Sequence, residues 1–248
     1  MVNRDTIRFV LCRPRIATNI SAAINFTRNL GFESTCIVSN TKPTRVDVPS
    51  DTDWHHTIRE ATANEFLTVG ITRRVGQRRK SSSLSLETFC DYLRRWYIRF
   101  NQSGLNTAGV AIVFGNESSG LSDDEIESCN LSVSIPTSVE CPSLNLSHAV
   151  AVVAYRIAVT LDDLDELNVA SLTRVDPGAG APVEPVLSRV DLESVANNLL
   201  DTIARGGYQL RDGPQGLKTY IRDLLARCAL TNTEAKYISD LITRVVNG

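Results

Sequence analysis

The sequence predicts an α/β fold built on a mostly parallel sheet, followed by a small helical domain. Short apolar runs alternate with segments of helical periodicity, as at 7–12 and 19–30, which is typical of parallel strands joined by helices. Proline and glycine then crowd residues 174–188, a composition typical of a linker, and the pattern beyond Asp191 is helical. We therefore expect an α/β domain at 1–166, a linker at 167–189 and an all-helical C-terminal domain at 190–248.

Each element follows from its apolar spacing and its flanking turn residues. Strands are expected at 7–12, 35–38, 66–71, 109–114 and 131–135, and helices at 19–30, 58–64, 86–100, 123–129 and 148–161. The C-terminal helices are expected at 190–205, 214–228 and 231–246. Thr18 or Asn19 is expected to cap the first helix, and Thr231 with Glu234 fits a capping box. Residues 40–56 are predicted to be rich in loop, and no element is predicted in the serine-rich segment 73–85.

Composition excludes several classes of protein. The chain has 248 residues, of which 42% are hydrophobic, so an ordinary folded core is expected. Its six cysteines form no C-x-x-C pair, which predicts reduced, mostly buried thiols in a cytoplasmic protein rather than disulfides or a zinc site. No apolar stretch approaches the roughly 18 residues of a membrane span. We expect a soluble, cytoplasmic protein with neither a membrane nor a metal as partner.

Charge is distributed unevenly, although the net charge is only −2. Residues 1–80 hold 13 Lys and Arg against 7 Asp and Glu, whereas residues 81–168 hold 4 against 12. A basic cluster lies at the end of the first block: Arg73, Arg74, Arg78, Arg79 and Lys80. Clustered arginine pairs with phosphates, so the cluster is a candidate RNA contact. The alternative is a solvated surface loop.

Three separated segments place polar residues and glycines after predicted strands. Asn19 follows the first strand, Gly-Asn-Glu-Ser-Ser-Gly-Leu spans 115–121, and Ser-Leu-Asn-Leu-Ser-His-Ala spans 143–149. In an open parallel sheet, ligands bind where the strands end. Gly115 and Gly120 would let the backbone approach such a ligand closely.

In order and spacing, these segments resemble the three motifs of the SpoU/TrmH-like branch of the SPOUT RNA methyltransferases. Residues 69–74 also resemble the V-G-T-[ST]-x-R segment of the TrmJ-type transfer-RNA enzymes, with Ile71 in place of threonine, and the C-terminal helices resemble that subgroup's tail. The resemblance implies a SPOUT α/β fold with a C-terminal trefoil knot. It implies methyl transfer from S-adenosylmethionine to an RNA ribose 2′-hydroxyl, by a homodimer, with transfer RNA favoured over ribosomal RNA.

The resemblance also implies roles for individual residues, each with a structural alternative. Asn19 and Asn145 could instead cap helices, and Glu117 could fix its loop through backbone N–H groups. The expected cofactor contacts are Ile71, Thr72, Arg73, Gly115, Glu117, Gly120, Ile135, Pro142, Ser143 and Leu144. The expected catalytic residues are Asn19, Arg28, Ser143 and Asn145. The expected RNA contacts are Arg13, Arg15, Arg74, Arg78, Arg79 and Lys80.

Arg28 stands in this set because the sequence departs from the family's first motif. The family has an arginine six residues after the motif asparagine, where this chain has Asn25. A neutral amide supplies neither a base nor a positive charge. Arg28 is roughly one helical turn further on and could replace the missing arginine, and Arg13 and Arg15 are the other candidates.

Two functional hypotheses remain open at this point. In the first, the chain is an active enzyme with a displaced arginine. In the second, it is a catalytically weakened RNA-binding module or ribosome-assembly factor that keeps the cofactor pocket. Cys141-Pro142, where the TrmJ-type pattern commonly has Tyr-Ser, leaves both open. A dinucleotide-binding Rossmann enzyme is disfavoured because the loop after Cys12 contains no glycine, and no P-loop motif occurs.

Overall fold

The protein is described by a computed structural model that covers eight stretches of the chain. They are 4–40, 48–49, 51–73, 83–101, 109–166, 186–207, 213–228 and 230–247. The predicted linker at 167–189 therefore lies largely outside the described residues. The same holds for the predicted RNA contacts Arg74, Arg78, Arg79 and Lys80.

A parallel sheet forms the centre of the molecule, as the sequence predicted. Within the described residues it has seven strands in the order β3-β2-β1-β6-β4-β7-β5, and every neighbouring pair is parallel. The strands are β1 (Ile7–Cys12), β2 (Thr35–Val38), β3 (Asp53–His55), β4 (Glu65–Ile71), β5 (Ser83–Ser85), β6 (Gly109–Phe114) and β7 (Leu131–Ser134). Because all strands run the same way, their carboxyl ends meet at a single edge.

The central strands are apolar along nearly their whole length because both of their faces are covered. Val, Ile, Leu and Phe in β1 and β6 are almost completely buried, which is the usual pattern for a parallel strand between helix layers. On one face, Phe9 stacks on Phe114 with ring centroids 6.3 Å apart and meets Phe32 edge-on at 5.3 Å. On the other face, Val10 and Val113 pack with Ile126.

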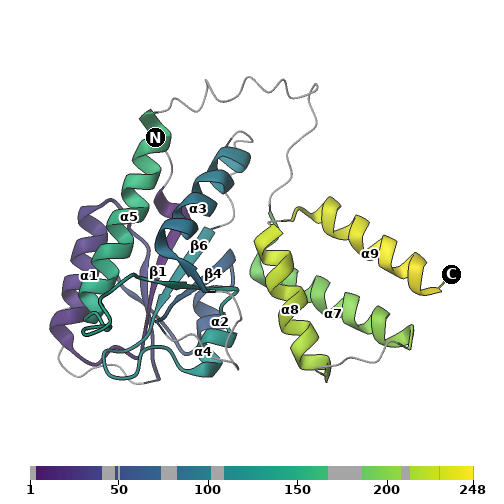
Figure 1. Ribbon diagram of the computed structural model, residues 1–248, viewed down its shortest axis with the longest axis horizontal. Coiled ribbons are helices and arrows are strands. Elements are labelled where there is room, and N and C mark those ends of the chain that lie inside the picture. The colour runs from purple at the N-terminus through teal and green to yellow at the C-terminus, as the bar shows by residue number, and fades with distance from the viewer. Residues whose placement is uncertain are drawn as a thin grey trace.

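Helices cover the two faces of the sheet (Figure 1). Helices α1 (Ala17–Asn29), α3 (Leu86–Asn101) and α5 (Leu146–Glu166) contribute to the larger apolar cluster, and α1 and α5 pack side by side. The short helices α2 (Ile58–Ala61) and α4 (Asp123–Glu127) contribute to the smaller cluster. A short 3-10 helix, η1 (Arg4–Thr6), precedes β1.

Three further helices follow the gap after residue 166: α7 (Arg189–Arg205), α8 (Gly213–Cys228) and α9 (Asn232–Asn247). Helix α7 packs against α8 and α9, and α7 and α8 also contact β4. The predicted capping box is confirmed, since the Glu234 N–H donates to Thr231 Oγ1 at 3.3 Å and the Thr231 N–H donates to Glu234 Oε2 at 2.9 Å. The three helices are therefore as expected, while the division into domains stays a prediction.

Two local predictions were wrong. Helix α1 begins at Ala17 with Ile16 at its N-cap and no side-chain cap, so neither Thr18 nor Asn19 caps it. The sequence also gave no sign of β3 and β5, which have three residues each and lie at the two edges of the sheet. Both are too short and too polar to form an apolar run, so only pairing with β2 and β7 makes them strands.

All six cysteines are free thiols; Cys141 and Cys228 are exposed and the other four are buried. In the described stretches, no helix is both long enough and apolar enough to cross a bilayer. The same stretches contain no group of three or more His, Cys, Asp or Glu side chains that could hold a metal ion.

Candidate active site

A pocket opens at the carboxyl edge of the sheet, beside the ends of β4, β6 and β7. Three segments form its walls: the end of β4, the loop after β6 at 115–121, and the connection from β7 to α5. All ten residues that the sequence assigned to a cofactor line this pocket: Ile71, Thr72, Arg73, Gly115, Glu117, Gly120, Ile135, Pro142, Ser143 and Leu144. Positions more than 70 residues apart in the sequence are thus brought to one cavity.

Further lining residues were missed by sequence reasoning, and most of them lie inside the motif segments. They are Phe114, Asn116, Ser118, Ser119, Leu121, Thr137, Leu146 and Ala149. Asn116 shows why such residues matter. Its Oδ1 accepts the N–H groups of Ser118 at 3.0 Å and Ser119 at 2.7 Å, and its carbonyl accepts the Gly120 N–H at 3.0 Å. Asn116 therefore closes the loop 115–121 on itself.

The two glycines of this loop are required for different reasons. A Cβ on Gly115 would lie 2.0 Å from the carbonyl carbon of Gly120 and 2.1 Å from the Leu121 nitrogen, so no side chain fits there. Gly120 has open space around its Cα but a φ of +66°, a left-handed conformation that other residues adopt only at a cost. The backbone of this loop thus folds back to van der Waals distance from its own start, beside the pocket.

A chain of hydrogen bonds joins the three motif segments. The Glu117 carboxylate accepts the backbone N–H groups of Arg15 and Ile16 at 3.0 and 3.1 Å, and the Asn19 Nδ2 at 3.0 Å. Asn145 Nδ2 in turn donates to Asn19 Oδ1 at 3.1 Å. Asn145 also caps α5, because its Oδ1 accepts the N–H of Ser147 at 2.9 Å. Glu117 does bind backbone N–H groups, but those of the β1–α1 connection rather than of its own loop.

The carboxylate determines how both amides are oriented. An ionised carboxylate only accepts, so Asn19 must turn its Nδ2 toward Glu117 and its Oδ1 toward Asn145. Asn145 must then donate through Nδ2, and its Oδ1 is left for the helix N-terminus. Each of the two amide nitrogens donates one N–H within this series of hydrogen bonds among the described residues. Its second N–H is not used there. Asn19 is 8% exposed, while Asn145 is open to solvent.

The same hydrogen bonds keep Glu117 ionised. Its partial burial by itself would raise the pKa of Glu117, but the bonds from Asn19, Arg15 and Ile16 outweigh burial and hold that pKa below its usual value of 4.5. At neutral pH the side chain is therefore a carboxylate with three donors around it. Such a group is a poor proton acceptor and a good anchor for the β1–α1 connection.

Arg13 is a predicted RNA contact, and in the structure its guanidinium is paired within the protein. Its Nε and Nη2 each donate to the Glu125 carboxylate at 2.7 Å, and Nη2 also reaches the Gly120 carbonyl at 3.3 Å. This pairing raises the pKa of Arg13. Arg13 also has a φ of 50°, which its bidentate bond to Glu125 helps to hold. The guanidinium therefore links the β1–α1 connection to α4 and to the loop 115–121.

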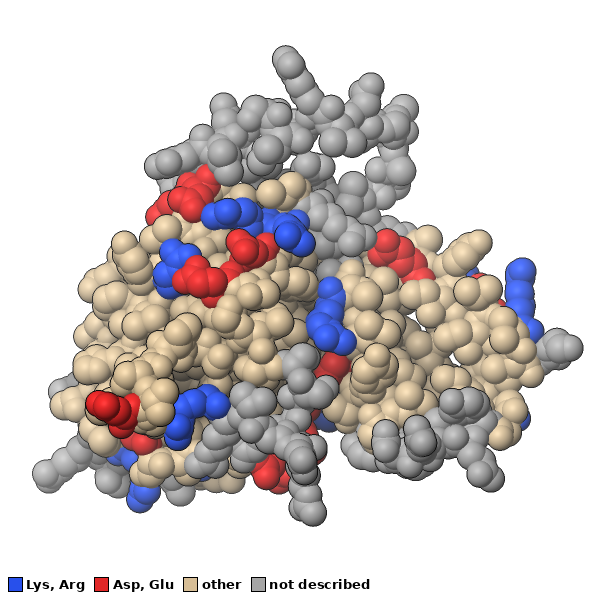
Figure 2. Space-filling view, in the orientation of Figure 1, with Lys and Arg blue, Asp and Glu red and all other residues tan. Residues whose placement is uncertain are grey.

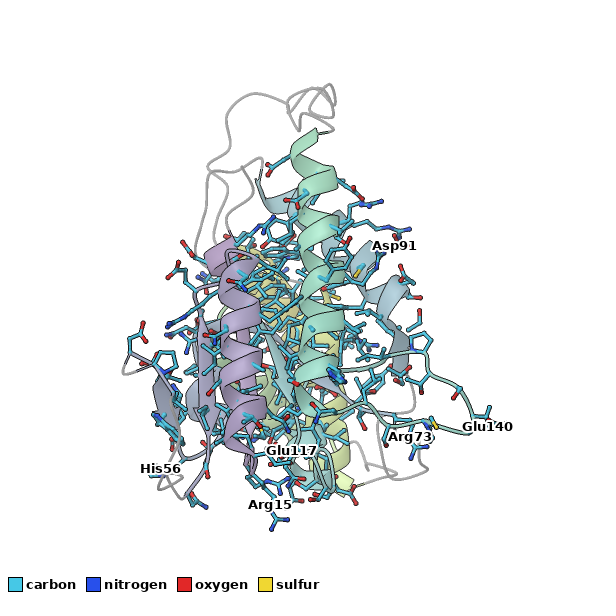
Figure 3. All side chains as sticks on the ribbon, turned by 90° about the vertical axis from the view of Figure 1, so that its left-hand side faces the viewer. Arg15, His56, Arg73, Asp91, Glu117 and Glu140 are labelled. Atoms are coloured by element: carbon cyan, nitrogen blue, oxygen red, sulfur yellow. The ribbon has the colours of Figure 1, made fainter. Side chains whose placement is uncertain are left out.

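Two other arginines lie in or beside the pocket, and Figure 3 labels both. Arg73 lines it and makes no ion pair with any residue that the structure describes. Arg15 is exposed at the lower ends of α1 and α5, next to Glu117, and its Nη1 donates to Ser118 Oγ at 3.4 Å. These are the positive charges available at the pocket among the described side chains.

Arg28 is not brought to this site within one chain. It lies in the last turn of α1, about 13 Å along the helix axis from Asn19 at a rise of 1.5 Å per residue. Its Nη2 donates to Asp51 Oδ2 at 2.8 Å. The expectation that Arg28 reaches back to serve in place of Asn25 therefore finds no support in the geometry of a single chain.

On the face of the molecule shown in Figure 2, acidic and basic side chains lie next to one another. Ion pairs among the described residues include Arg156 with Glu87 at 2.6 Å and Arg94 with Asp163 at 2.9 Å. Among the side chains drawn in colour, this face carries no field of a single sign. The unpaired charges of Arg15 and Arg73 at the pocket are thus the better candidates for binding an anion.

The stability of the chain should depend on pH through Glu117. Because its pKa is lowered on folding, its hydrogen bonds stabilise the chain fully above 4.5, and this contribution is lost as the pH falls through the folded-state pKa. Glu117→Gln should lower the free energy of unfolding by roughly 0.5–1 kcal/mol at neutral pH, a modest amount because solvent screens a partly exposed carboxylate, and the difference should shrink in acid. Urea unfolding between about pH 7 and about pH 3 measures it.

Glu140→Gln is the control for this measurement. Glu140 is an exposed carboxylate at the same edge of the molecule, and its replacement should leave the unfolding free energy nearly unchanged at every pH. A wild-type advantage over Glu117→Gln that persisted undiminished in acid would contradict the role given to the ionised carboxylate.

Comparison with known proteins agrees with this geometry. The chain is 30% identical over 138 residues to the tRNA (cytidine/uridine-2′-O-)-methyltransferase TrmJ of Yersinia pestis (strain Pestoides F), which covers 56% of this chain and 51% of that protein. It is 30% identical over 164 residues to the tRNA (cytidine-2′-O-)-methyltransferase TrmJ of Methanocaldococcus jannaschii, which covers 61% of this chain and 66% of that protein. The match to the first of these curated relatives thus spans about half of its length.

The fold has a close counterpart among solved structures. TrmJ from Z. mobilis ZM4 superposes with a TM-score of 0.64 at 21% identity, over 96% of this chain and 98% of that one. At this identity the likeness concerns the fold alone. The sequence profile of the SpoU rRNA methylase family matches residues 6–155, which is more than half of the chain and includes the three linked motif segments. The chain therefore belongs to the SpoU rRNA methylase family.

Proposed function

We propose that this protein transfers a methyl group from S-adenosylmethionine to a ribose 2′-hydroxyl of transfer RNA. The observation that carries the proposal is the single pocket lined by all ten residues assigned to the cofactor, with Asn19 and Asn145 hydrogen-bonded beside it. The named activity of the TrmJ relatives supports the reaction and the class of RNA. That both relatives are named for transfer RNA favours it over ribosomal RNA.

The residues of the pocket fit an adenosyl group with a charged amino-acid tail. Apolar walls from Ile71, Ile135 and Leu144 suit a flat base, and the hydroxyls of Ser118 and Ser119 suit polar atoms. Arg73 offers a cation for a carboxylate, and Glu117 a carboxylate for an amine. When bound, S-adenosylmethionine supplies a methyl group on a sulfonium sulfur, which is already electrophilic. Catalysis by the chain is then largely a matter of positioning.

Asn19 and Asn145 would hold the ribose. Each amide has one N–H committed to the Glu117 chain and a second N–H left for a substrate oxygen. Donors aimed at an oxygen that gains negative charge lower the barrier for its attack. Ser143, exposed on the pocket wall, is a further polar contact. Glu117 acts through the two amides and does not take the ribose proton, since its lowered pKa makes it a weak base.

We assign the positive charge at the reaction site to Arg15 and Arg73 rather than to Arg28. Arg73 lines the pocket and Arg15 donates to Ser118, a lining residue, whereas Arg28 pairs with Asp51. Arg15 is well suited to a phosphate beside the target ribose because its guanidinium is exposed and its backbone already belongs to the Glu117 network. The basic residues Arg74, Arg78, Arg79 and Lys80 extend the proposed RNA contact along the chain from Arg73.

The proposal includes a trefoil knot at the cofactor loops. It rests on the resemblance of the three motif segments to the SPOUT methyltransferases; the approach of Gly115 to Gly120 is a local closure of the loop 115–121. Such knots are rare in proteins generally. A cytoplasmic location also belongs to the proposal, since the proposed RNA substrate occurs there.

The proposed assembly is a homodimer formed through α1 and α5. Along α5, Val152 and Tyr155 are 38% and 56% exposed on one side of an otherwise apolar helix, and near the pocket Ile16 and Leu144 are 47% and 39% exposed. Exposed apolar side chains along α5 and in the segments just before α1 and α5 favour an interface. A second copy would cover them and enclose the pocket edge.

Cofactor binding should distinguish the two loop glycines. Gly115→Ala places a Cβ against the Gly120 backbone, so the loop must move and the dissociation constant for S-adenosylhomocysteine should rise on the order of 100-fold. In Gly120→Ala the added Cβ meets no atom within 4 Å. The only penalty is the left-handed φ, whose conformational cost is about 1–2 kcal/mol. Calorimetric titration of both variants measures the contrast. If both variants bound S-adenosylhomocysteine as tightly as the wild type does, a cofactor site beside these two glycines would be contradicted.

Methyl transfer tests the reaction itself. Labelled methyl from S-adenosylmethionine is offered to bulk transfer RNA and ribosomal RNA, and ribose methylation is expected in transfer RNA. Asn145→Asp keeps the oxygen that caps α5 but loses both amide N–H groups, so kcat should fall on the order of 100-fold. Arg15→Gln removes a charge without disturbing the Glu117 bond to the backbone, and should raise KM for RNA. Arg28→Gln should leave both constants unchanged.

The outcomes separate the competing hypotheses. Cofactor binding without transfer to any RNA would favour the alternative, an RNA-binding module that keeps the pocket. Methylation of ribosomal RNA alone would overturn the choice of transfer RNA. If Arg28→Gln lost activity while Arg15→Gln kept it, the positive charge at the reaction site would be assigned to Arg28 instead of Arg15.

The oligomeric state has its own test. Tyr155→Asp puts a charge into the exposed apolar strip of α5, where a monomer would tolerate it, so it should convert a dimer into monomers without lowering the free energy of unfolding of the monomer. Light scattering at micromolar concentration measures the mass, and Tyr237→Asp on α9, which is also exposed, is the control. A monomeric wild-type protein would refute the proposed dimer.

A further inference from the structure

Two arginines of the C-terminal helices are buried against the sheet, and both bind the end of α4. Arg189 of α7 is 2% exposed and Arg222 of α8 is 8% exposed. Arg189 Nη2 donates to the Ser128 carbonyl at 2.8 Å, and Arg222 Nη2 donates to the carbonyls of Glu127 at 2.6 Å and Cys129 at 3.3 Å. Three consecutive carbonyls, those of the last residue of α4 and of the two residues after it, are thus held by side chains from the other end of the chain. In Figure 1, α4 lies beside α8.

These bonds supply hydrogen-bond donors to carbonyls at the C-terminal end of α4. A helix leaves its last carbonyls without partners inside the helix. The carbonyl of Asp124 accepts from Ser128, that of Glu125 from Cys129 Sγ, and that of Ile126 from the Cys129 N–H. The last carbonyl of the helix, that of Glu127, takes its donor from Arg222. Without the C-terminal helices, the carbonyls of Glu127, Ser128 and Cys129 would lose these charged donors.

Arg189 is also held on the sheet side. Its Nη1 donates to Thr62 Oγ1 at 2.7 Å and lies 3.4 Å from Thr68 Oγ1, and its Nε lies 3.4 Å from Glu193. Burial is the main cause that lowers the pKa of Arg189. A buried guanidinium is tolerated only where its N–H groups are satisfied in a definite geometry. The arginine therefore specifies how α7 and α4 lie relative to each other.

The other end of α4 belongs to the pocket. Ser122 and Glu125 form a capping box at its first turn, and the Glu125 carboxylate also receives Arg13. Arg13 reaches the Gly120 carbonyl, and Leu121, which lines the pocket, is buried with Ile126 and Cys129 in one apolar cluster. A displacement of this short helix would therefore carry the loop 115–121 with it.

Resting on the proposed function, we propose that Arg189 and Arg222 are positioning residues for the cofactor site. They hold the C-terminal end of α4, and α4 holds the loop 115–121 in the shape that binds S-adenosylmethionine. In this reading the C-terminal helices form part of the scaffold of the cofactor pocket, in addition to any contact that they make with RNA.

The test compares Arg189→Met with Arg59→Met in the full chain. Arg59 also joins the sheet region to α7, through an ion pair with Glu193, but its side chain is 65% exposed and, among the described residues, it donates no hydrogen bond to the carbonyls at the end of α4. Two readouts are measured: the dissociation constant for S-adenosylhomocysteine and amide hydrogen exchange along the chain. Arg189→Met should weaken binding about tenfold, the loss expected when bonds to a charged group are removed, while Arg59→Met should leave it unchanged.

Hydrogen exchange separates positioning from loss of stability. In Arg189→Met, exchange should rise in residues 116–130, including the Gly120 N–H, and stay at the wild-type rate in β1 and α1. Thr62→Val is the milder second variant, should Arg189→Met fail to fold. It removes one acceptor of Arg189 without altering the C-terminal helices, and about a threefold loss of binding is expected.

The proposal is overturned if Arg189→Met folds and binds the ligand as wild type does, or if exchange rises equally in β1 and in the loop. If Arg189→Met does not fold, wild-type binding by Thr62→Val overturns it. A wild-type chain that bound no S-adenosylhomocysteine would refute the proposed function instead, and the exchange pattern would still report whether α4 positions the loop.

Discussion

The polar edge of this molecule depends on one carboxylate. Glu117 lies in the loop after β6, and its two oxygens accept two backbone N–H groups of the β1–α1 connection and the amide of Asn19. Through Asn19 it also orients Asn145 at the start of α5. Three segments that are far apart in sequence are therefore held in register by a group that can only accept hydrogen bonds. A neutral side chain of the same shape would not impose the same order on the amides.

The sheet beneath this polar edge is apolar. Its central strands carry almost only apolar side chains, and packing on both faces holds their ends in place. Polar groups begin where the strands end, because backbone groups there leave the sheet and need other partners. Asn116 supplies such partners within its own loop, and Arg13 supplies them between loops. The pocket is thus a set of short, mutually bonded loops on a rigid base.

The C-terminal helices extend this support to the far side of α4. Arg189 and Arg222 use their long side chains to reach carbonyls that no nearby backbone could serve. Burying two guanidinium groups costs free energy unless every bond is made, so such an interface favours one arrangement over many. A region that looks like an appendage in sequence, beyond a proline-rich and glycine-rich stretch, is in this way bound to the helix that follows the pocket loop 115–121.

Sequence pattern was enough for the main strands and most helices, because buried strands must be apolar. The ten expected pocket residues came from the family resemblance, and eight further lining residues were not foreseen. Sequence pattern was not enough for β3 and β5, whose three residues become strands only by pairing with a neighbour. Nor could it separate Arg13, Arg15 and Arg28, which share one side-chain chemistry. Partners from distant segments, Glu125, Ser118 and Asp51, decide what each of them does. Spacing along the chain records local geometry, whereas the partner of a long charged side chain is known only when the fold has brought it there.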